Sequence, residues 1–149
     1  MEIKLPVSVI LKAKGSHVHS THPESTVIEA VRLMNQKKIG ALVILHQNQP
    51  IGMFTERDVL LRIVDAGRNP NNTRVREVMT ENLVVINPDS TIEDTMRIMS
   101  QKRCRHLPVL ENERLCGLIS IGDLMRWLVR EHEAYIENLL DYISGRYPS

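Results

Sequence analysis

The sequence predicts a mixed α/β (α+β) protein made of two copies of one β-α-β-β-α unit. The chief observation is an internal repeat: residues 23–62 align without a gap on residues 88–127, an offset of 65, and 11 of the 40 pairs are identical. Helical and strand periodicities alternate in the same order in both copies. The chain has 149 residues, 42% hydrophobic and 25% charged, which suits one compact domain or two small ones.

The identical pairs are spread over the whole unit and not confined to one motif. They are Pro23/Pro88, Ser25/Ser90, Thr26/Thr91, Arg32/Arg97, Met34/Met99, Gln36/Gln101, Lys37/Lys102, Leu42/Leu107, Leu45/Leu110, Gly52/Gly117 and Asp58/Asp123. Upstream, three apolar pairs match at an offset of 68: Val7/Val75, Ile10/Val78 and Leu11/Met79. The first copy therefore carries three extra residues before its proline.

Each copy is predicted to open with a short apolar strand, near Val18 in the first copy and over residues 83–86 in the second. A proline and a Ser-Thr pair then begin an amphipathic helix in each copy. A hydroxyl and a carboxylate three residues apart can satisfy the free N–H groups of the first helical turn. The predicted pairs are Thr26 with Glu29 and Thr91 with Asp94.

Two short strands and a second helix complete each unit. The predicted strands are 42–45 and 51–54 in the first copy and 107–110 and 115–119 in the second. The second helix is expected from near Arg57 to Gly67, and from about Gly122 in the other copy. One unit of this size cannot close a core alone, so we expect the two copies to pack sheet to sheet with pseudo-twofold symmetry.

These patterns divide the chain into a first repeat at 7–67, a polar linker at 68–74, a second repeat at 75–130 and a C-terminal helical extension at 131–146. The apolar residues of the extension fall mostly at three- and four-residue spacing, and Gly145 is predicted to end it. An apolar stripe that continues past its own repeat suggests a contact between copies of the chain. Packing back onto its own repeat is the alternative.

Composition argues against several classes of protein. Lysine and arginine number 19 against 18 acidic residues, so the net charge of +1 gives no general attraction to nucleic acid. Cys104 and Cys116 lie in apolar stretches and are interpreted as buried thiols of a reducing compartment. No apolar run approaches the ~20 residues of a membrane span, and the apolar segment 7–11 is too short for a signal peptide. We expect a soluble, cytoplasmic protein.

The strongest local match between the copies is a glycine, two apolar residues, a hydroxyl, two variable residues and an aspartate. The hydroxyl and carboxylate are Thr55 and Asp58 in one copy and Ser120 and Asp123 in the other. They fall where a strand ends and a helix begins, a place that favours phosphate. A carboxylate can also accept hydrogen bonds from the vicinal hydroxyls of ribose. The pattern indicates a nucleoside-phosphate site; plain helix capping is the alternative, and the two can coexist.

A second cluster, Arg103, Arg105 and His106, stands at a predicted helix-to-strand junction. Arginine suits bidentate contact with phosphate, although a solvated basic helix end would have the same composition. In the first copy Gly40 and Ala41 take the places of Arg105 and His106, which leaves room for a planar base against the backbone. The two sites are therefore expected to differ.

Together these features resemble a tandem pair of cystathionine-β-synthase-type (CBS) domains, the Bateman module, and above all its stand-alone bacterial-type members. The residues that carry the resemblance are Pro-x-Ser-Thr with its amphipathic helix, IGALVIL or RHLPVL, and Gly-x-x-Thr/Ser-x-x-Asp. The resemblance covers about residues 7–130. It implies a regulatory module that binds adenosine derivatives in two clefts between the repeats and pairs into disc-shaped homodimers.

The resemblance also assigns roles to residues of this chain. It places Thr55 and Asp58 on the ribose and phosphate of one ligand, and Ser120 and Asp123 on those of the other. Arg105 and His106 would face phosphates, with Arg103 and Pro108 beside them. The other implied contacts are Ile39, Gly40 and Ala41 against an adenine, Arg57 toward phosphate, and Thr80. The absence of Arg and His from the first copy favours unequal affinities.

Other functions are weighed against this one. The chain has no GxSxG, HExxH, P-loop or GxGxxG motif, so we expect no enzyme. The histidines of SHVHSTH suggest a metal site as an alternative, and the basic clusters suggest nucleic-acid binding as another. A dimerisation scaffold without ligand is a further alternative. The leading hypothesis is an adenine-nucleotide sensor acting on an effector protein in another chain, and the residues do not separate AMP, ADP, ATP, NAD(H) and adenosylmethionine.

Overall fold

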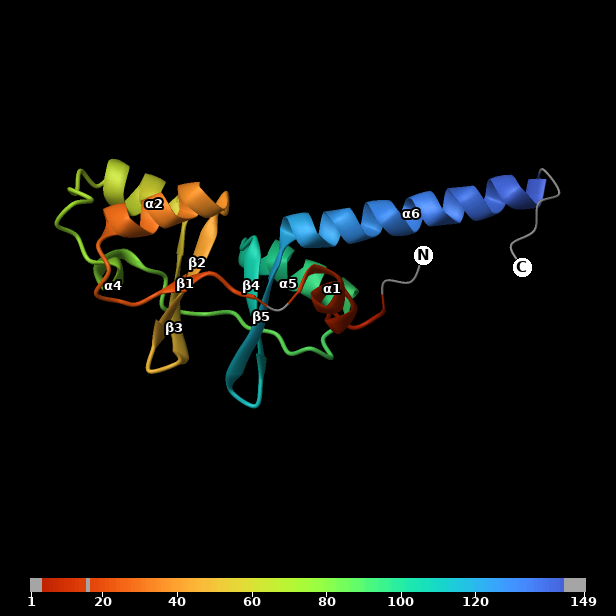
Figure 1. Cartoon of the computed structure of the whole chain (residues 1–149), viewed down its shortest axis with the longest axis horizontal. Coiled ribbons are helices and arrows are strands. Elements are labelled where there is room, and N and C mark those ends of the chain that lie inside the picture. Colours follow the sequence, from red (N-terminus) through yellow and green to blue (C-terminus); the bar gives the residue numbers. More distant parts are fainter. Residues whose placement is uncertain (1–3, 16, 144–149) are drawn as a thin grey trace.

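The structure is a computed structural model that describes residues 4–15 and 17–143, and the predicted mixed α/β fold is confirmed. In chain order its elements are α1 Ser8–Lys14, β1 Ser20–Thr21, α2 Val27–Lys37, β2 Ala41–His46, β3 Gln49–Thr55, α3 Glu56–Asp58, the π-helix η1 Val59–Val64, α4 Val75–Val78, α5 Ile92–Lys102, β4 His106–Glu111, β5 Arg114–Ser120 and α6 Ile121–Ile143. Two hairpins lie next to each other, and α6 extends away from them (Figure 1).

The two hairpins share one register. β2 pairs antiparallel with β3 from Ala41 opposite Thr55, and β4 pairs antiparallel with β5 from His106 opposite Ser120. Each ladder shifts register at the same step, after Ile44 in one and after Val109 in the other. The sheets contact each other through β3 and β5. The offset of 65 is therefore preserved in the backbone, down to an irregularity of pairing.

The opening strands are shorter than predicted. In the first copy β1 is a two-residue strand parallel to β2, and it begins two residues after Val18. In the second copy the strand expected over 83–86 is absent, because only Ile86 pairs with its neighbour, through a bridge to Val109. An apolar run can be held by one or two backbone bonds plus packing, so its composition alone overstates the strand.

The amphipathic helices α2 and α5, one in each copy, begin and end in the same way. Thr26 and Thr91 accept hydrogen bonds from the amides of Glu29 and Asp94, at 3.3 and 3.0 Å, as the capping pattern predicted. The C-cap residues Lys38 and Arg103 follow α2 and α5, and their φ angles of 56° and 53° are left-handed. These residues turn the chain directly into β2 and β4.

The second helices differ between the copies, and here the sequence prediction was partly wrong. The helix expected from Arg57 to Gly67 is a short turn, α3, followed by the π-helix η1, which ends at Val64. The second copy instead continues as one α-helix of 23 residues from Ile121, close to the predicted start. That helix covers most of the expected extension, and residues 144–146 lie outside the described residues. In the described part of the chain no helix is both long and apolar enough to cross a membrane.

The core of each half contains the leading helix of the other sequence copy. Val7, Ile10 and Leu11 of the α1 segment pack with Ile86, Ile92, Met99, Leu107, Val109, Ile119 and Leu124. The α4 segment packs with the first copy, in a core of Val27, Ala30, Met34, Leu42, Ile44, Phe54, Ile63, Val75, Val78 and Met79.

Matched backbone bonds secure this exchange. Val7 donates to the Ser90 carbonyl and Val75 donates to the Ser25 carbonyl, both at 2.8 Å. The packing units therefore differ from the sequence copies, and the boundaries 7–67 and 75–130 stay predictions. Because of this exchange, Lys14 at the end of α1 lies beside Asp123 near the start of α6. In the same way Thr80, which follows the α4 segment, lies beside Asp58 in α3.

Candidate functional site

The Thr55–Asp58 and Ser120–Asp123 pairs are reciprocal helix caps. The Thr55 amide donates to Asp58 Oδ2 at 2.9 Å, and the Asp58 amide donates to Thr55 Oγ1 at 3.3 Å. In the second copy the corresponding distances are 2.8 and 3.1 Å. Both carboxylates are buried, with 5% and 6% of each residue exposed. Capping and a buried acceptor therefore coexist at each strand-to-helix junction.

The first carboxylate faces a hydroxyl. Thr80 Oγ1 donates to Asp58 Oδ1 at 3.1 Å, and the Thr80 backbone exchanges two hydrogen bonds with Met53, at 2.8 and 2.9 Å. The resemblance had singled out Thr80, and the structure places it beside Asp58. Arg62 also approaches Asp58 Oδ1, at 3.8 Å from its Nε atom, although its Nη1 atom donates to the carbonyls of Val78 and Met79. Sequence reasoning missed Arg62, which the i,i+4 spacing from Asp58 could have indicated.

The second carboxylate faces two cations. Lys14 Nζ lies 2.7 Å from Asp123 Oδ2, and Arg126 Nη2 lies 2.7 Å from Asp123 Oδ1. Burial raises the pKa of the Asp123 carboxyl, but hydrogen bonds from Lys14 and from the Ser120 amide lower it by more, so the net pKa lies below its ordinary value. Sequence reasoning missed both cations. Arg126 is three residues from Asp123 and could have been found, whereas nothing local connects Lys14 with a carboxylate 109 residues away.

The junctions before β2 and β4 lie against these two sites. The Glu56 amide donates to the Gly40 carbonyl at 3.0 Å, and in the second copy the Ile121 amide donates to the Arg105 carbonyl at 2.8 Å. The room expected at Gly40 is covered by Glu56, since a Cβ atom on Gly40 would lie 2.8 Å from Glu56 Oε1. The Glu56 residue itself is exposed.

The pKa of His106 depends on charged groups from both copies. Burial lowers the pKa of its imidazole most, the carboxylates of Glu56 and Asp123 raise it, and Lys14 and Arg105 lower it further. The net pKa is below the ordinary value. One of these carboxylates comes from the first copy and the other from the second, so His106 senses the charges of both.

The remaining predicted residues differ in accessibility. Arg57, Arg103 and Arg105 are exposed, Ala41 is buried, and Ile39 packs at the edge of the first core. Pro108 is buried within β4, where its carbonyl accepts a hydrogen bond from Ile86.

The histidine segment holds a ring contact. The rings of His17 and His19 meet edge to face with centroids 4.7 Å apart. The pKa of His19 is lowered, mainly by burial and then by the charges of His17 and Lys37. Among the described residues no group of three or more histidine, cysteine or acidic side chains is placed to hold a metal ion.

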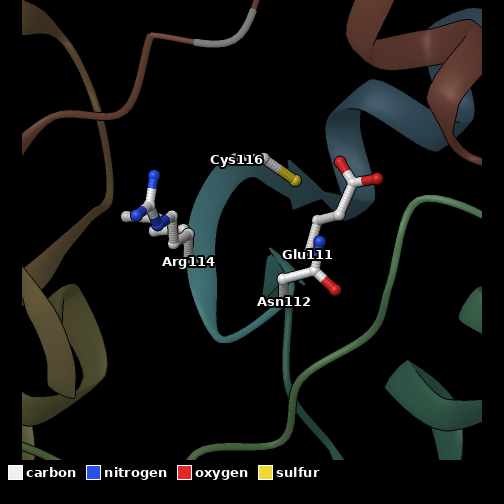
Figure 2. Close-up of a pocket in the computed structure, with 5 residues that line it drawn as sticks. Glu111, Asn112, Arg114 and Cys116 are labelled. Atoms are coloured by element: carbon white, nitrogen blue, oxygen red, sulfur yellow. The ribbon is translucent and has the colours of Figure 1, made fainter.

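A further hollow lies elsewhere, at the turn between β4 and β5. It is open, about 620 Å³, and surrounded by Glu111, Asn112, Arg114, Leu115 and Cys116 (Figure 2). This turn is at the opposite end of the hairpin from Ser120. Cys116 and Cys104 are free thiols that are half-buried and not fully buried as the sequence predicted, and burial raises the pKa of both. We therefore assign no chemistry to this hollow.

Comparison with known proteins identifies the repeat. The family model of the CBS domain matches residues 15–65 and 75–130. The CBS domain-containing protein CBSX3, mitochondrial, of Arabidopsis thaliana is 35% identical over 150 residues, covering 95% of this chain and 73% of the relative. The CBS-domain containing protein ATU1752 from Agrobacterium tumefaciens has a solved structure with 37% identity and a TM-score of 0.78, covering 81% of this chain and 97% of that one.

A more distant structure shares the fold alone. The CBS domain pair of protein MJ0100, solved in complex with methylthioadenosine and S-adenosyl-L-methionine, is 21% identical with a TM-score of 0.72. It covers 83% of this chain and 98% of that chain.

Proposed function

This chain belongs to the CBS-domain family as a tandem pair, and we propose that it is a cytoplasmic regulatory module that binds an adenine nucleotide, AMP, ATP or NAD(H), between its two copies. The observation that carries the proposal is the pair of buried carboxylates, Asp58 and Asp123, each beside a hydroxyl at the start of a helix. The MJ0100 pair, in complex with two adenosine derivatives, supports the same ligand class for this fold.

The chemistry of the site suits a nucleotide. Each carboxylate offers acceptor atoms to the vicinal hydroxyls of ribose, and these bonds gain strength because the carboxylate is charged and buried. The exposed guanidinium groups of Arg57, Arg103 and Arg105 are available for phosphate. None of these groups forms a nucleophile paired with a base, so the proposed role is binding and not catalysis.

We propose that the module acts as a homodimer on a partner in another chain. Leu60 and Val64 of η1 are more than half exposed, and so are Met125 and Val129, which occupy the matched places in α6. Large exposed apolar side chains that recur in both copies favour an interface. A ligand would then shift the arrangement of the dimer by its differential affinity for two states. These same surfaces also favour the alternative, a dimerisation scaffold without ligand.

Calorimetry with AMP, ATP, NAD, NADH and adenosylmethionine tests the proposal on the wild type and on the Asp58→Asn and Asp123→Asn variants. Each substitution keeps the side-chain shape and removes the acceptor charge. Asp65→Asn is the matched control, because Asp65 is exposed in the same half. A ligand at 100 times its dissociation constant should raise the free energy of unfolding by about 2.7 kcal/mol.

The expected result is binding that at least one site variant loses and the control keeps. If no compound of the panel binds the wild type while the protein sediments as a dimer, the scaffold alternative replaces the sensor. If every variant binds as the wild type does, the ligand site lies elsewhere in the molecule.

A further inference from the structure

A small hollow between α1 and α6 adjoins the second carboxylate. Its volume is about 80 Å³, several times the ~10–15 Å³ that one water needs. The charged groups that line it are Lys14, Arg126, Arg130 and Asp123. Three cations and one carboxylate thus line the hollow, which carries a positive formal charge, and two of the cations, Lys14 and Arg126, contact Asp123. Asp123 belongs both to its wall and to the proposed second nucleotide site.

The cations hold both oxygens of Asp123. Lys14 Nζ donates to Oδ2, where the Ser120 amide also donates, and Arg126 donates to Oδ1. Lys14 is further anchored by a 2.8 Å bond to the Leu118 carbonyl. Ribose hydroxyls need these acceptor atoms. A ligand therefore has to compete with two charges before it can engage Asp123.

The first site presents no such obstacle. There the matched leading segment supplies Thr80, whose hydroxyl can turn away from Asp58 at little cost. The Arg62 guanidinium is directed to the carbonyls of Val78 and Met79, and its Nε atom is 3.8 Å from the carboxylate. A neutral nucleoside can free Asp58 by displacing a hydroxyl, whereas at Asp123 it would leave an ammonium group without its counter-ion.

We propose that the hollow between α1 and α6 is an anion subsite, and that Lys14 makes the second site select phosphorylated over uncharged adenosine derivatives. A phosphate in the hollow draws Lys14 and Arg126 away from Asp123 and so releases the carboxylate for the ribose. An uncharged ligand offers nothing in exchange. This inference rests on the proposed function and adds to it which ligand charge each site takes.

Calorimetric titrations with AMP and with adenosine, in an Asp58→Asn background that leaves only the second site, test the inference. The reference protein should bind AMP more tightly than adenosine. Lys14→Met should lower the ratio of AMP to adenosine affinity about tenfold, the size of one charge-assisted contact. Lys12→Met is the matched control, since Lys12 is exposed on the same helix and lines neither the hollow nor the site.

A second variant keeps the test decisive if Lys14→Met does not fold. Arg130 is an exposed residue on the wall of the hollow, and Arg130→Gln should lower the same ratio. An unchanged ratio in each variant that folds, with AMP still bound, overturns the inference and leaves the proposed function intact. Failure of AMP and ATP to bind the Asp58→Asn protein overturns the inference, whereas the proposed function is rejected only when no compound of the nucleotide panel binds the wild type.

Discussion

The two halves of the molecule share one backbone and differ in what surrounds the buried carboxylate. Both have the reciprocal cap, the register shift between paired strands and the exchanged leading helix. Yet Asp58 meets the hydroxyl of Thr80, and Asp123 meets Lys14 and Arg126. The repeat therefore sets where an acceptor is presented, while the chain segment arriving from the other copy decides whether it is available.

The largest change in stability is expected from a test of whether the exchanged leading helices link the unfolding of the two halves. Phe54 is fully buried in the first core, and Phe54→Ala should lower the free energy of unfolding by roughly 3–5 kcal/mol. Trp127, the single tryptophan, packs against the second core and reports on that half. Because the leading helices are exchanged, we expect the urea midpoint followed by Trp127 fluorescence to fall as well.

Ile119 occupies the matched place in the second core and provides the control. Ile119→Val should cost about 0.5–1.5 kcal/mol and shift the same single transition. A Phe54→Ala protein whose circular dichroism loses stability while its Trp127 transition stays unchanged would show that the halves unfold independently.

A second comparison concerns the glycines against which the leading helices pack. A Cβ atom on Gly52 would lie 2.8 Å from Met79 Sδ and 2.9 Å from the backbone oxygen of Thr80. On Gly117 it would lie 2.6 Å from Leu11 Cδ2, and its three nearest atoms all belong to that flexible side chain. Gly52→Ala should therefore cost about 1–3 kcal/mol, the range of overpacking, and Gly117→Ala less.

Chemical denaturation of the two alanine variants measures this difference. Combining Gly117→Ala with Leu11→Val should recover part of the loss, because the shorter side chain gives the new methyl group room. The reverse order of the two single variants would mean that the close approach at Gly52 relaxes more easily than the backbone contact suggests.

The sequence predicts the parts of this molecule that depend on local patterns. The helix caps at Thr26 and Thr91 and the start of α6 follow from residues three or four apart. The pairing of Thr55 with Asp58 is equally local. Such features recur in both copies because the backbone bonds they satisfy are the same.

The parts that escaped prediction depend on distant contacts or on small energy differences. Lys14 reaches Asp123 only because α1 packs into the second core. The π-helix η1 and the α-helix α6 arise from similar apolar periodicity, and periodicity does not separate the two hydrogen-bond patterns. The missing strand over 83–86 shows that an apolar segment need not supply a ladder.

The smallest expected change in stability concerns His106, which occupies the position that Ala41 has in the first copy. The pKa of His106 is lowered from 6.5, chiefly by burial, while Glu56 and Asp123 oppose the shift and Lys14 and Arg105 add to it. Above the unfolded pKa of 6.5 the imidazole is neutral in both the folded and the unfolded chain, so its burial does not lower the free energy of unfolding. As the pH falls toward the folded pKa, the unfolded chain binds more protons and stability is lost.

His106→Ala makes the second copy like the first at this position, and it should flatten the pH dependence between 6.5 and the folded pKa of His106. The measurement is the urea midpoint of each protein at a series of pH values across that window. His132→Gln, on an exposed histidine of α6, is the control and should keep the wild-type slope. If His106→Ala retains that slope, the loss of stability in this pH window does not come from protonation of His106. The charges of the two halves then do not act through this residue.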